Sequence, residues 1–149
     1  MFYEILTRYV HFLSLFIMIA ALSSQAITLR DTMHRKYIRR LSVIDAFYGF
    51  SAILVVGAGM MLWLVVGKPG EFYSQNYYFL VKMGLVILLG LLSLHPTIFF
   101  LRKRKGENPD EMVAIPASVK WVIRLELFLL LFIPLCATLM AKGIGYFGN

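Results

Sequence analysis

His11 and Lys82 are the residues whose types and positions best suit chemistry inside a very apolar chain. A neutral imidazole can ligate haem iron or another metal ion, and a nearby ammonium group could pair with a haem propionate or an acidic substrate. We therefore take both as candidate catalytic and cofactor-binding residues, with His11 as the candidate ligand of a haem iron. The structural alternative places His11 at an interface near Tyr9 and lets Lys82 extend to the surface beside Tyr77 and Tyr78.

A second set of polar residues lies toward the other end of the same apolar segments. The predicted inner-leaflet polar network consists of Arg30, Asp45, His95, Arg124 and Glu126, with Gln25, Tyr48 and Thr97 at similar depths. Such a network would serve as a proton route or a second binding site, and His95 is a further candidate for cofactor binding. In the structural alternative, Arg124 and Glu126 are partly hydrated near the interface, and Asp45 and Arg30 pair to cap helix ends.

Long apolar segments must position both sets. Charged residues make up only 15% of the 149-residue chain and hydrophobic residues 60%, whereas an ordinary soluble domain carries about 25% charged residues. Uncharged runs of 21, 22 and 19 residues occupy positions 9–29, 46–67 and 83–101. Because ~20 helical residues span a bilayer core of ~30 Å, each run predicts a membrane-spanning helix.

The predicted fold is therefore all-α, a four-helix transmembrane bundle that forms a single integral membrane domain. The predicted spans are approximately residues 8–30, 44–67, 77–101 and 118–141. The fourth uncharged run has only 15 residues. The fourth helix consequently reaches spanning length only if it includes Arg124 and Glu126.

The basic residues predict how the helices are oriented. Eleven of the 15 Lys and Arg residues lie in or beside the two loops on one side of the predicted bundle. By the positive-inside rule these loops face the cytoplasm, which gives an up-down-up-down topology with both termini outside. A cleaved signal peptide ending at the small residues 20–26 is the alternative interpretation of the first apolar segment.

This organisation excludes several classes of function. Four spans leave no room for a soluble catalytic domain, and the net charge of +7 resides mostly in short loops, so we expect no nucleic-acid partner. The single cysteine, Cys136, excludes an intrachain disulfide, and no Cys/His cluster has zinc-ligand spacing. The methionines lack paired spacing, so we interpret them as packing residues rather than haem or copper ligands. The first expected partner is the lipid bilayer.

Several sequence runs resemble a bacterial family described only as four-helix membrane proteins of unknown function. The runs are Asp45-Ala-Phe-Tyr-Gly, Lys68-Pro-Gly, Phe79-Leu-Val-Lys and Ser93-Leu-His-Pro-Thr. The resemblance covers roughly residues 8–140, and it combines a Tyr-Gly pair, a Lys-Pro-Gly turn and a Pro-Thr step at matching separations. It implies a multi-pass protein of the bacterial cytoplasmic (inner) membrane.

That family is distantly similar to the HemJ-type protoporphyrinogen oxidases and to CopD-like membrane proteins. In HemJ-type proteins a histidine on the first helix and a lysine on the third are functional, and haem b is bound. His11 and Lys82 occupy those helices here. The resemblance thus implies a redox function, in which a porphyrinogen is oxidised and the electrons pass to quinones. The rest of the HemJ-type sequence is not reproduced, and no second axial ligand is evident.

Our leading hypothesis from the sequence is a haem b-binding or haem-associated redox protein of the inner membrane. His11 would ligate the iron, and Lys82 would hold a propionate or a porphyrin carboxylate. The alternative is a non-enzymatic membrane protein, either a small transporter or an interaction subunit. A homodimer is plausible in both cases, because four short helices enclose little interior. Whether the protein is an enzyme stays open.

Overall fold

Four long helices make up most of the computed structural model, which describes residues 1–148. The helices are α1 (Phe2–Thr28), α2 (Arg35–Met61), α4 (Tyr77–Lys103) and α5 (Ala117–Ala141). A short π-helix, η1 (Leu62–Val66), continues α2. Each long helix is apolar and long enough to cross a membrane. The predicted four-helix bundle is therefore confirmed.

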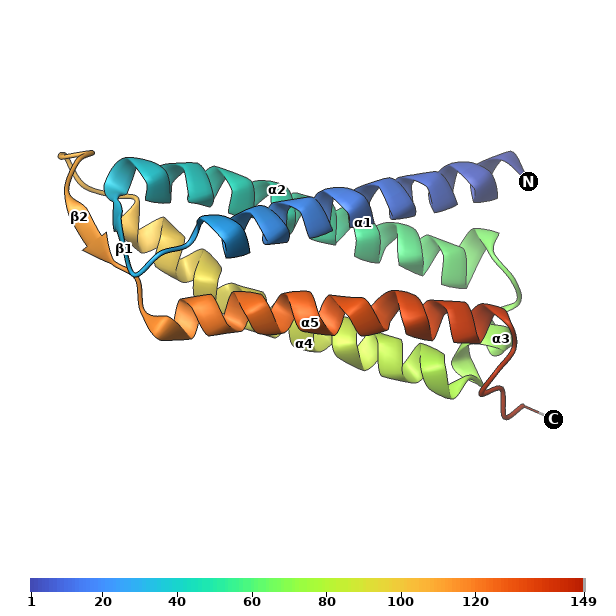
Figure 1. Cartoon of the computed structure of the whole chain (residues 1–149). Helices are drawn as coiled ribbons and strands as arrows, with labels where there is room; N and C mark the ends of the chain where they lie inside the picture. Colours follow the sequence, from blue (N-terminus) through green and yellow to red (C-terminus); the bar gives the residue numbers. More distant parts are fainter. Residues whose placement is uncertain (149) are drawn as a thin grey trace.

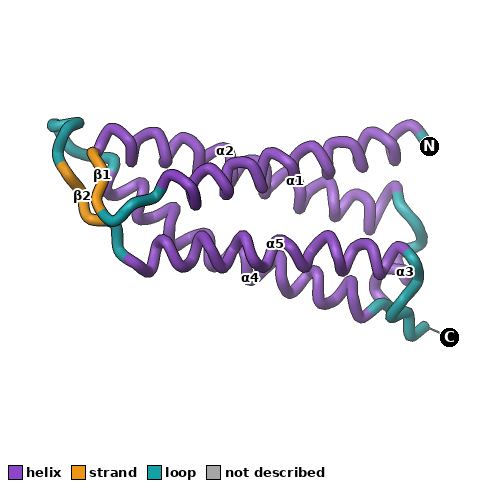
Figure 2. The backbone as a smooth tube through the Cα atoms, in the orientation of Figure 1, coloured by secondary structure: helices purple, strands orange, loops and turns teal. Residues whose placement is uncertain are grey.

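The chain runs up and down the bundle, as Figure 1 shows. We call the end where α1 begins and α5 ends the terminal end; it also carries the short helix α3 (Gly70–Ser74). The opposite end, the sheet end, carries two three-residue strands that are coloured orange in Figure 2. Strands β1 (Thr32–His34) and β2 (Met112–Ala114) pair antiparallel, with Met33 opposite Val113. The sequence analysis treated both strands as loop residues.

Two helix boundaries differ from the predicted spans. Helix α1 begins at Phe2 rather than near residue 8, because Arg8 is itself helical and pairs with Glu4 one turn earlier at 2.7 Å. Helix α2 begins at Arg35 rather than near residue 44. Its first turns carry basic residues whose guanidinium groups bind the loop that follows α4, with Arg39 Nη2 donating to the Gly106 carbonyl at 2.6 Å. Charge therefore marks the predicted limit of the membrane rather than the limit of the helix.

The fourth helix confirms the expectation made from its short uncharged run. Helix α5 extends from Ala117 to Ala141 and includes both Arg124 and Glu126. Pro116 stands immediately before its first residue, where a proline is well tolerated because its missing N–H has no partner within the helix. Arg124 and Glu126 consequently lie on one continuous helix.

The helices pack as two pairs, α1 with α2 and α4 with α5, which meet through α1–α5 and α2–α4 contacts. The largest hydrophobic cluster includes fully buried Leu22, Ile38, Phe100 and Ile123 and lies toward the sheet end. A smaller cluster around Tyr73, Phe79 and Met140 closes the terminal end. Many large apolar side chains project outward, as expected for helices in contact with lipid.

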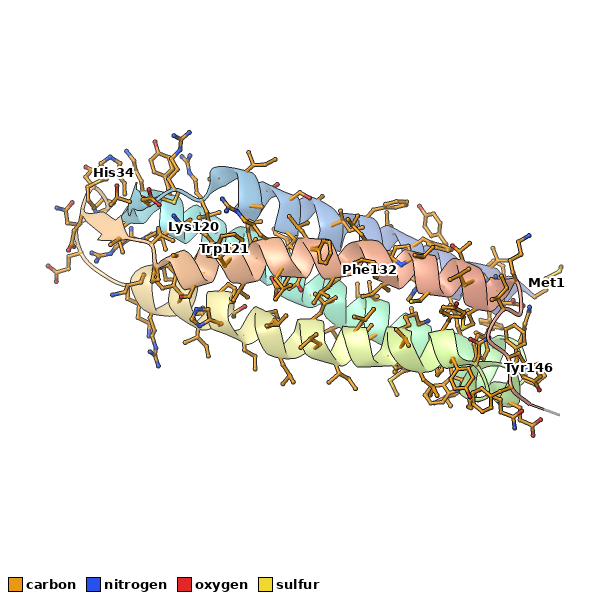
Figure 3. All side chains as sticks on the ribbon, turned by 60° about the horizontal axis from the view of Figure 1, so that its bottom comes forward. Met1, His34, Lys120, Trp121, Phe132 and Tyr146 are labelled. Atoms are coloured by element: carbon orange, nitrogen blue, oxygen red, sulfur yellow. The ribbon has the colours of Figure 1, made fainter. Side chains whose placement is uncertain are left out.

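Figure 3 shows side chains along the whole bundle, with His34 and Lys120 at the sheet end and Met1 and Tyr146 at the terminal end. The two basic loops lie at the sheet end. By the positive-inside rule, this end is predicted to face the cytoplasm.

Candidate functional site

A cavity lies among the four long helices in the terminal half of the bundle. Two adjoining hollows form it, and both are partly open to the outside of the bundle. The two hollows share the lining residues His11, Gly59, Trp63, Phe79 and Lys82. The structure thus brings the two principal sequence candidates, His11 and Lys82, to one cavity.

The imidazole of His11 is fixed by the backbone of the neighbouring helix. Its Nδ1 lies 2.9 Å from the carbonyl oxygen of Val55 on α2. A carbonyl oxygen can only accept, so Nδ1 must carry the hydrogen and donate it. In the neutral ring Nε2 then has a free lone pair, which is the state that binds a metal ion. One hydrogen bond therefore sets both the orientation and the tautomer of His11.

Gly59 makes this close approach possible. A Cβ atom built at position 59 would lie 3.3 Å from Cε1 of His11 and 3.6 Å from its Nδ1. The imidazole ring thus packs against bare helix backbone. A glycine in an apolar helix usually indicates close helix packing, and Gly59 provides such a close approach for α1. The sequence gives no signal that would link it to His11.

Lys82 enters the cavity without a counter-ion. Its side chain is half-buried, and its Nζ lies 5.2 Å from the centre of the Phe79 ring. Within residues 1–148 the structure contains no ion pair to this ammonium group. Two exposed cations line the wider hollow as well: Lys68, whose Nζ lies 4.2 Å from the Phe72 ring, and Arg8. Neither Arg8 nor Lys68 was predicted as a site residue.

Aromatic side chains form much of the apolar wall. Trp63 and Phe79 line both hollows, and Tyr73 lines the wider one. Tyr73 is buried, and the Trp63 ring packs 5.0 Å from the Phe79 ring. An apolar cavity edged by cations suits a flat, apolar molecule that carries acidic groups.

The donor set of the cavity fits haem better than a bare metal ion. No group of three or more His, Cys, Asp or Glu side chains that could hold a metal ion occurs in the described part of the chain. Haem iron needs only axial ligands from the protein, because the porphyrin supplies the other nitrogens. His11 can supply one such ligand, and the thioethers of Met60 and Met83 line the narrower hollow. From the sequence, these methionines were interpreted as packing residues. In this hollow, their sulfur atoms are the soft donors that could serve as a second axial ligand.

The polar network predicted for the inner leaflet is only partly assembled. Asp45 and Glu126 are buried, with 7% and 1% of their surface exposed, and are close enough for their charges to interact. Gln25 Nε2 donates to Asp45 Oδ1 at 3.1 Å, and Thr97 Oγ1 donates to Asp45 Oδ2 at 2.7 Å. Hydrogen bonds to Asp45 thus join α1, α2 and α4, and the buried Glu126 adds a residue of α5 that forms no hydrogen bond to them within the described chain.

Three predicted members, Arg30, His95 and Arg124, lie outside this network. All three are exposed. His95 Nε2 instead lies 3.1 Å from Ser118 Oγ, and the Arg124 guanidinium lies 5.4 Å from the centre of the Trp121 ring. Each helical residue is rotated by ~100° from the previous one, so Arg124 points nearly opposite to Glu126. Similar depth in the membrane does not give a shared direction. His95 is absent from the terminal-end cavity for another reason, because it lies 13 residues, or about 20 Å, from Lys82 along α4.

Comparison with known proteins identifies one family. A family model described as "Predicted membrane protein (DUF2214)" matches residues 3–145. No curated protein and no solved structure matches the chain. The family description thus agrees with the four apolar helices and names no activity.

Proposed function

Because the chain belongs to the family of predicted membrane proteins DUF2214, whose description names no activity, we propose a function from its own residues: it binds haem b in the terminal-end cavity and acts as a membrane redox protein. The resemblance to HemJ-type oxidases suggested the cofactor. The cavity supplies independent support for it.

The observation that carries the proposal is the hydrogen bond from His11 Nδ1 to the Val55 carbonyl at 2.9 Å. Histidines that ligate metals almost always donate the other ring N–H to a carboxylate, a backbone carbonyl or water. Here Nε2 is left as an acceptor, and His11 lines an apolar cavity.

The cations around the cavity suit the two acidic groups of a haem. Lys82 would hold one propionate inside the cavity, because its ammonium group is half-buried and lacks an acidic partner in the described chain. Lys68, at the mouth, would meet the other, while Arg8 is already engaged by Glu4. Trp63 and Phe79 would cover the apolar face of the ring. Bound haem would supply one-electron redox chemistry.

The same groups would accept a related substrate. A porphyrin or porphyrinogen carries carboxylates on an apolar macrocycle, so it would pair with Lys82 and Lys68 in the same manner. Membrane quinones are a chemically suitable electron acceptor, as the resemblance to HemJ-type enzymes implies. These finer assignments are separate from haem binding and need their own assays.

Absorption spectroscopy tests the proposal directly. Protein purified from haem-replete cells should show a Soret band, and His11→Ala should lose it. His95→Ala is the matched control, because His95 is a span histidine that is exposed and bound to Ser118; this variant should keep the band. Monodispersity on a sizing column shows whether each variant is folded.

A colourless, monodisperse wild type that also fails to take up added haem would refute the proposal. The cavity would then serve a different anionic amphiphile, in line with the alternative of a non-enzymatic transporter or interaction subunit. A Soret band that persists in His11→Ala but disappears in His95→Ala would place the haem elsewhere on the protein.

A further inference from the structure

Two buried carboxyl groups lie in the half of the bundle away from the cavity. Asp45 belongs to α2 and Glu126 to α5. Glu126 is nine residues beyond the first residue of α5, which places it about 13 Å along the helix. Only 7% of Asp45 and 1% of Glu126 is exposed. Both carboxyls interact electrostatically with each other and with the hydroxyl group of buried Tyr48.

The two carboxyls differ in their hydrogen bonds. Asp45 accepts one from Gln25 on α1 and one from Thr97 on α4, so both of its oxygens are engaged. Oε1 of Glu126 is buried and has no hydrogen-bond partner among the described residues. A buried ionised carboxylate without a partner is strongly unfavourable, whereas two donors stabilise the charge on Asp45.

No positive charge compensates the pair within residues 1–148. Neither carboxyl forms an ion pair there. On α5, Arg124 is exposed over Trp121 and Lys120 pairs with Asp31. The groups that reach the pair from α1 and α4 are the neutral Gln25 and Thr97. Two adjacent negative charges in such a site are unstable, so the pair requires one bound cation.

A proton meets this requirement better than a metal ion. Hard metal ions such as Ca²⁺ and Mg²⁺ gather about six or more oxygen ligands. Here both oxygens of Asp45 already accept hydrogen bonds, which leaves Glu126 as the open group. A proton needs only one oxygen, and Glu126 can provide it.

We propose that Glu126 and Asp45 form an intramembrane proton-binding site, in which Glu126 holds one exchangeable proton beside ionised Asp45. The proton exchanges with the sheet end. Gln25 lies three residues before the end of α1, about 5 Å along the helix, and Thr97 is only half-buried. The inference uses no part of the haem proposal, because the residues of this site do not line the terminal-end cavity.

Infrared spectroscopy of the purified full-length protein in lipid nanodiscs tests this site. At neutral pH the wild type should show the C=O stretching band of a protonated carboxylic acid, and the band should shift in D₂O. Replacing sodium chloride by choline chloride should leave it unchanged. Glu126→Gln should lose the band, whereas Asp45→Asn should keep it. Glu107→Gln, at an exposed loop position, is the matched control and should keep it as well.

Several results would overturn the proposal. A wild-type band that is absent at neutral pH, or that disappears when sodium replaces choline, would show that the pair is ionised or holds a metal ion. A band that survives Glu126→Gln but is lost in Asp45→Asn would place the proton on Asp45. A band that never shifts in D₂O would show a static proton. The sodium and D₂O measurements use the wild type, so they decide the question even if Glu126→Gln fails to fold.

Discussion

Gly59 controls how closely His11 approaches α2, and Gly59→Ala therefore probes the proposed ligand without touching it. The added Cβ would lie 3.3 Å from Cε1 of His11, a contact short enough to displace the ring by a few tenths of an ångström. The hydrogen bond from Nδ1 to Val55 is 2.9 Å long, so this displacement weakens it. We expect the ring to lose its fixed tautomer and orientation.

Gly59→Ala should lower haem affinity while leaving folding stability nearly unchanged. Gly→Ala in a helix gains about 1 kcal/mol, and a weakened hydrogen bond costs about 1 kcal/mol, so the folding stability should change little. Loss of a residue that orients a metal ligand typically lowers metal affinity about 10- to 100-fold. We therefore expect haem affinity in Gly59→Ala to fall by that factor while the thermal unfolding temperature stays close to wild type.

Titration of haem into the apo-protein, followed at the Soret band, measures the affinity. Circular dichroism measures unfolding, and ¹⁵N NMR of the His11 ring reports the tautomer in the absence of haem. Gly57→Ala is the matched control, because Gly57 lies on the same helix and a Cβ there would meet nothing within 4 Å. Haem affinity that falls equally in both variants, or an unchanged affinity and tautomer in Gly59→Ala, would refute the reasoning.

Three further predictions concern the cavity, the core and the sheet end. Lys82→Met should weaken haem binding about 10- to 100-fold in the same titration, because a charge-assisted hydrogen bond contributes about 1.5–3 kcal/mol; equal binding would show that Lys82 only extends to the interface. Phe100→Ala should destabilise the protein by about 3–5 kcal/mol in thermal or denaturant unfolding, since Phe100 is fully buried, whereas exposed Phe128→Ala should have little effect. A hydrogen bond from Lys120 lowers the pKa of the Asp31 carboxyl below its ordinary value, so its contribution is present above the unfolded-state pKa and is lost as pH falls through the lower folded-state pKa. Hydrogen exchange of the β1–β2 ladder should accordingly be faster in Asp31→Asn than in wild type near neutral pH, and the two should converge in acid.

The four helices could be predicted because a helix needs ~20 uncharged residues to span the bilayer core, and runs of about this length can be recognised in the sequence. This constraint does not fix where a helix ends. Arg35 and Arg39 remain helical beyond the predicted span, and their side chains bind carbonyl groups at the end of α4 and in the loop that follows it. The β1–β2 ladder could not be predicted, because three-residue strands carry no readable period and their partners, such as Met33 and Val113, are far apart in the sequence.

For the candidate site residues, the depth in the membrane could be predicted, but the side of the helix on which each residue lies could not. His11 and Lys82 each lie near the terminal end of their helices, and the up-down-up-down topology brings them to one cavity. The same reasoning grouped Arg124 with Glu126, although a separation of two residues turns them to opposite sides of α5. The contact between Gly59 and His11 could not be predicted, because it depends on which residue of α1 faces the glycine.

The placement of the buried charges is itself an argument for function. Lys82 lies in one half of the bundle, whereas Glu126 and Asp45 lie in the other; along α4, Lys82 and Thr97 are 15 residues apart, or about 22 Å. A bundle selected only for stability would pair such charges or replace them by apolar residues, because a buried charge without a partner is costly. In the part of the chain that the structure describes, the cation beside His11 has no acidic partner and the acid pair has no cation, so each arrangement calls for a ligand of opposite charge. An acidic cofactor at the terminal end and a proton toward the sheet end would satisfy both requirements, so the protein would hold a redox group and an exchangeable proton at different depths of the same membrane domain.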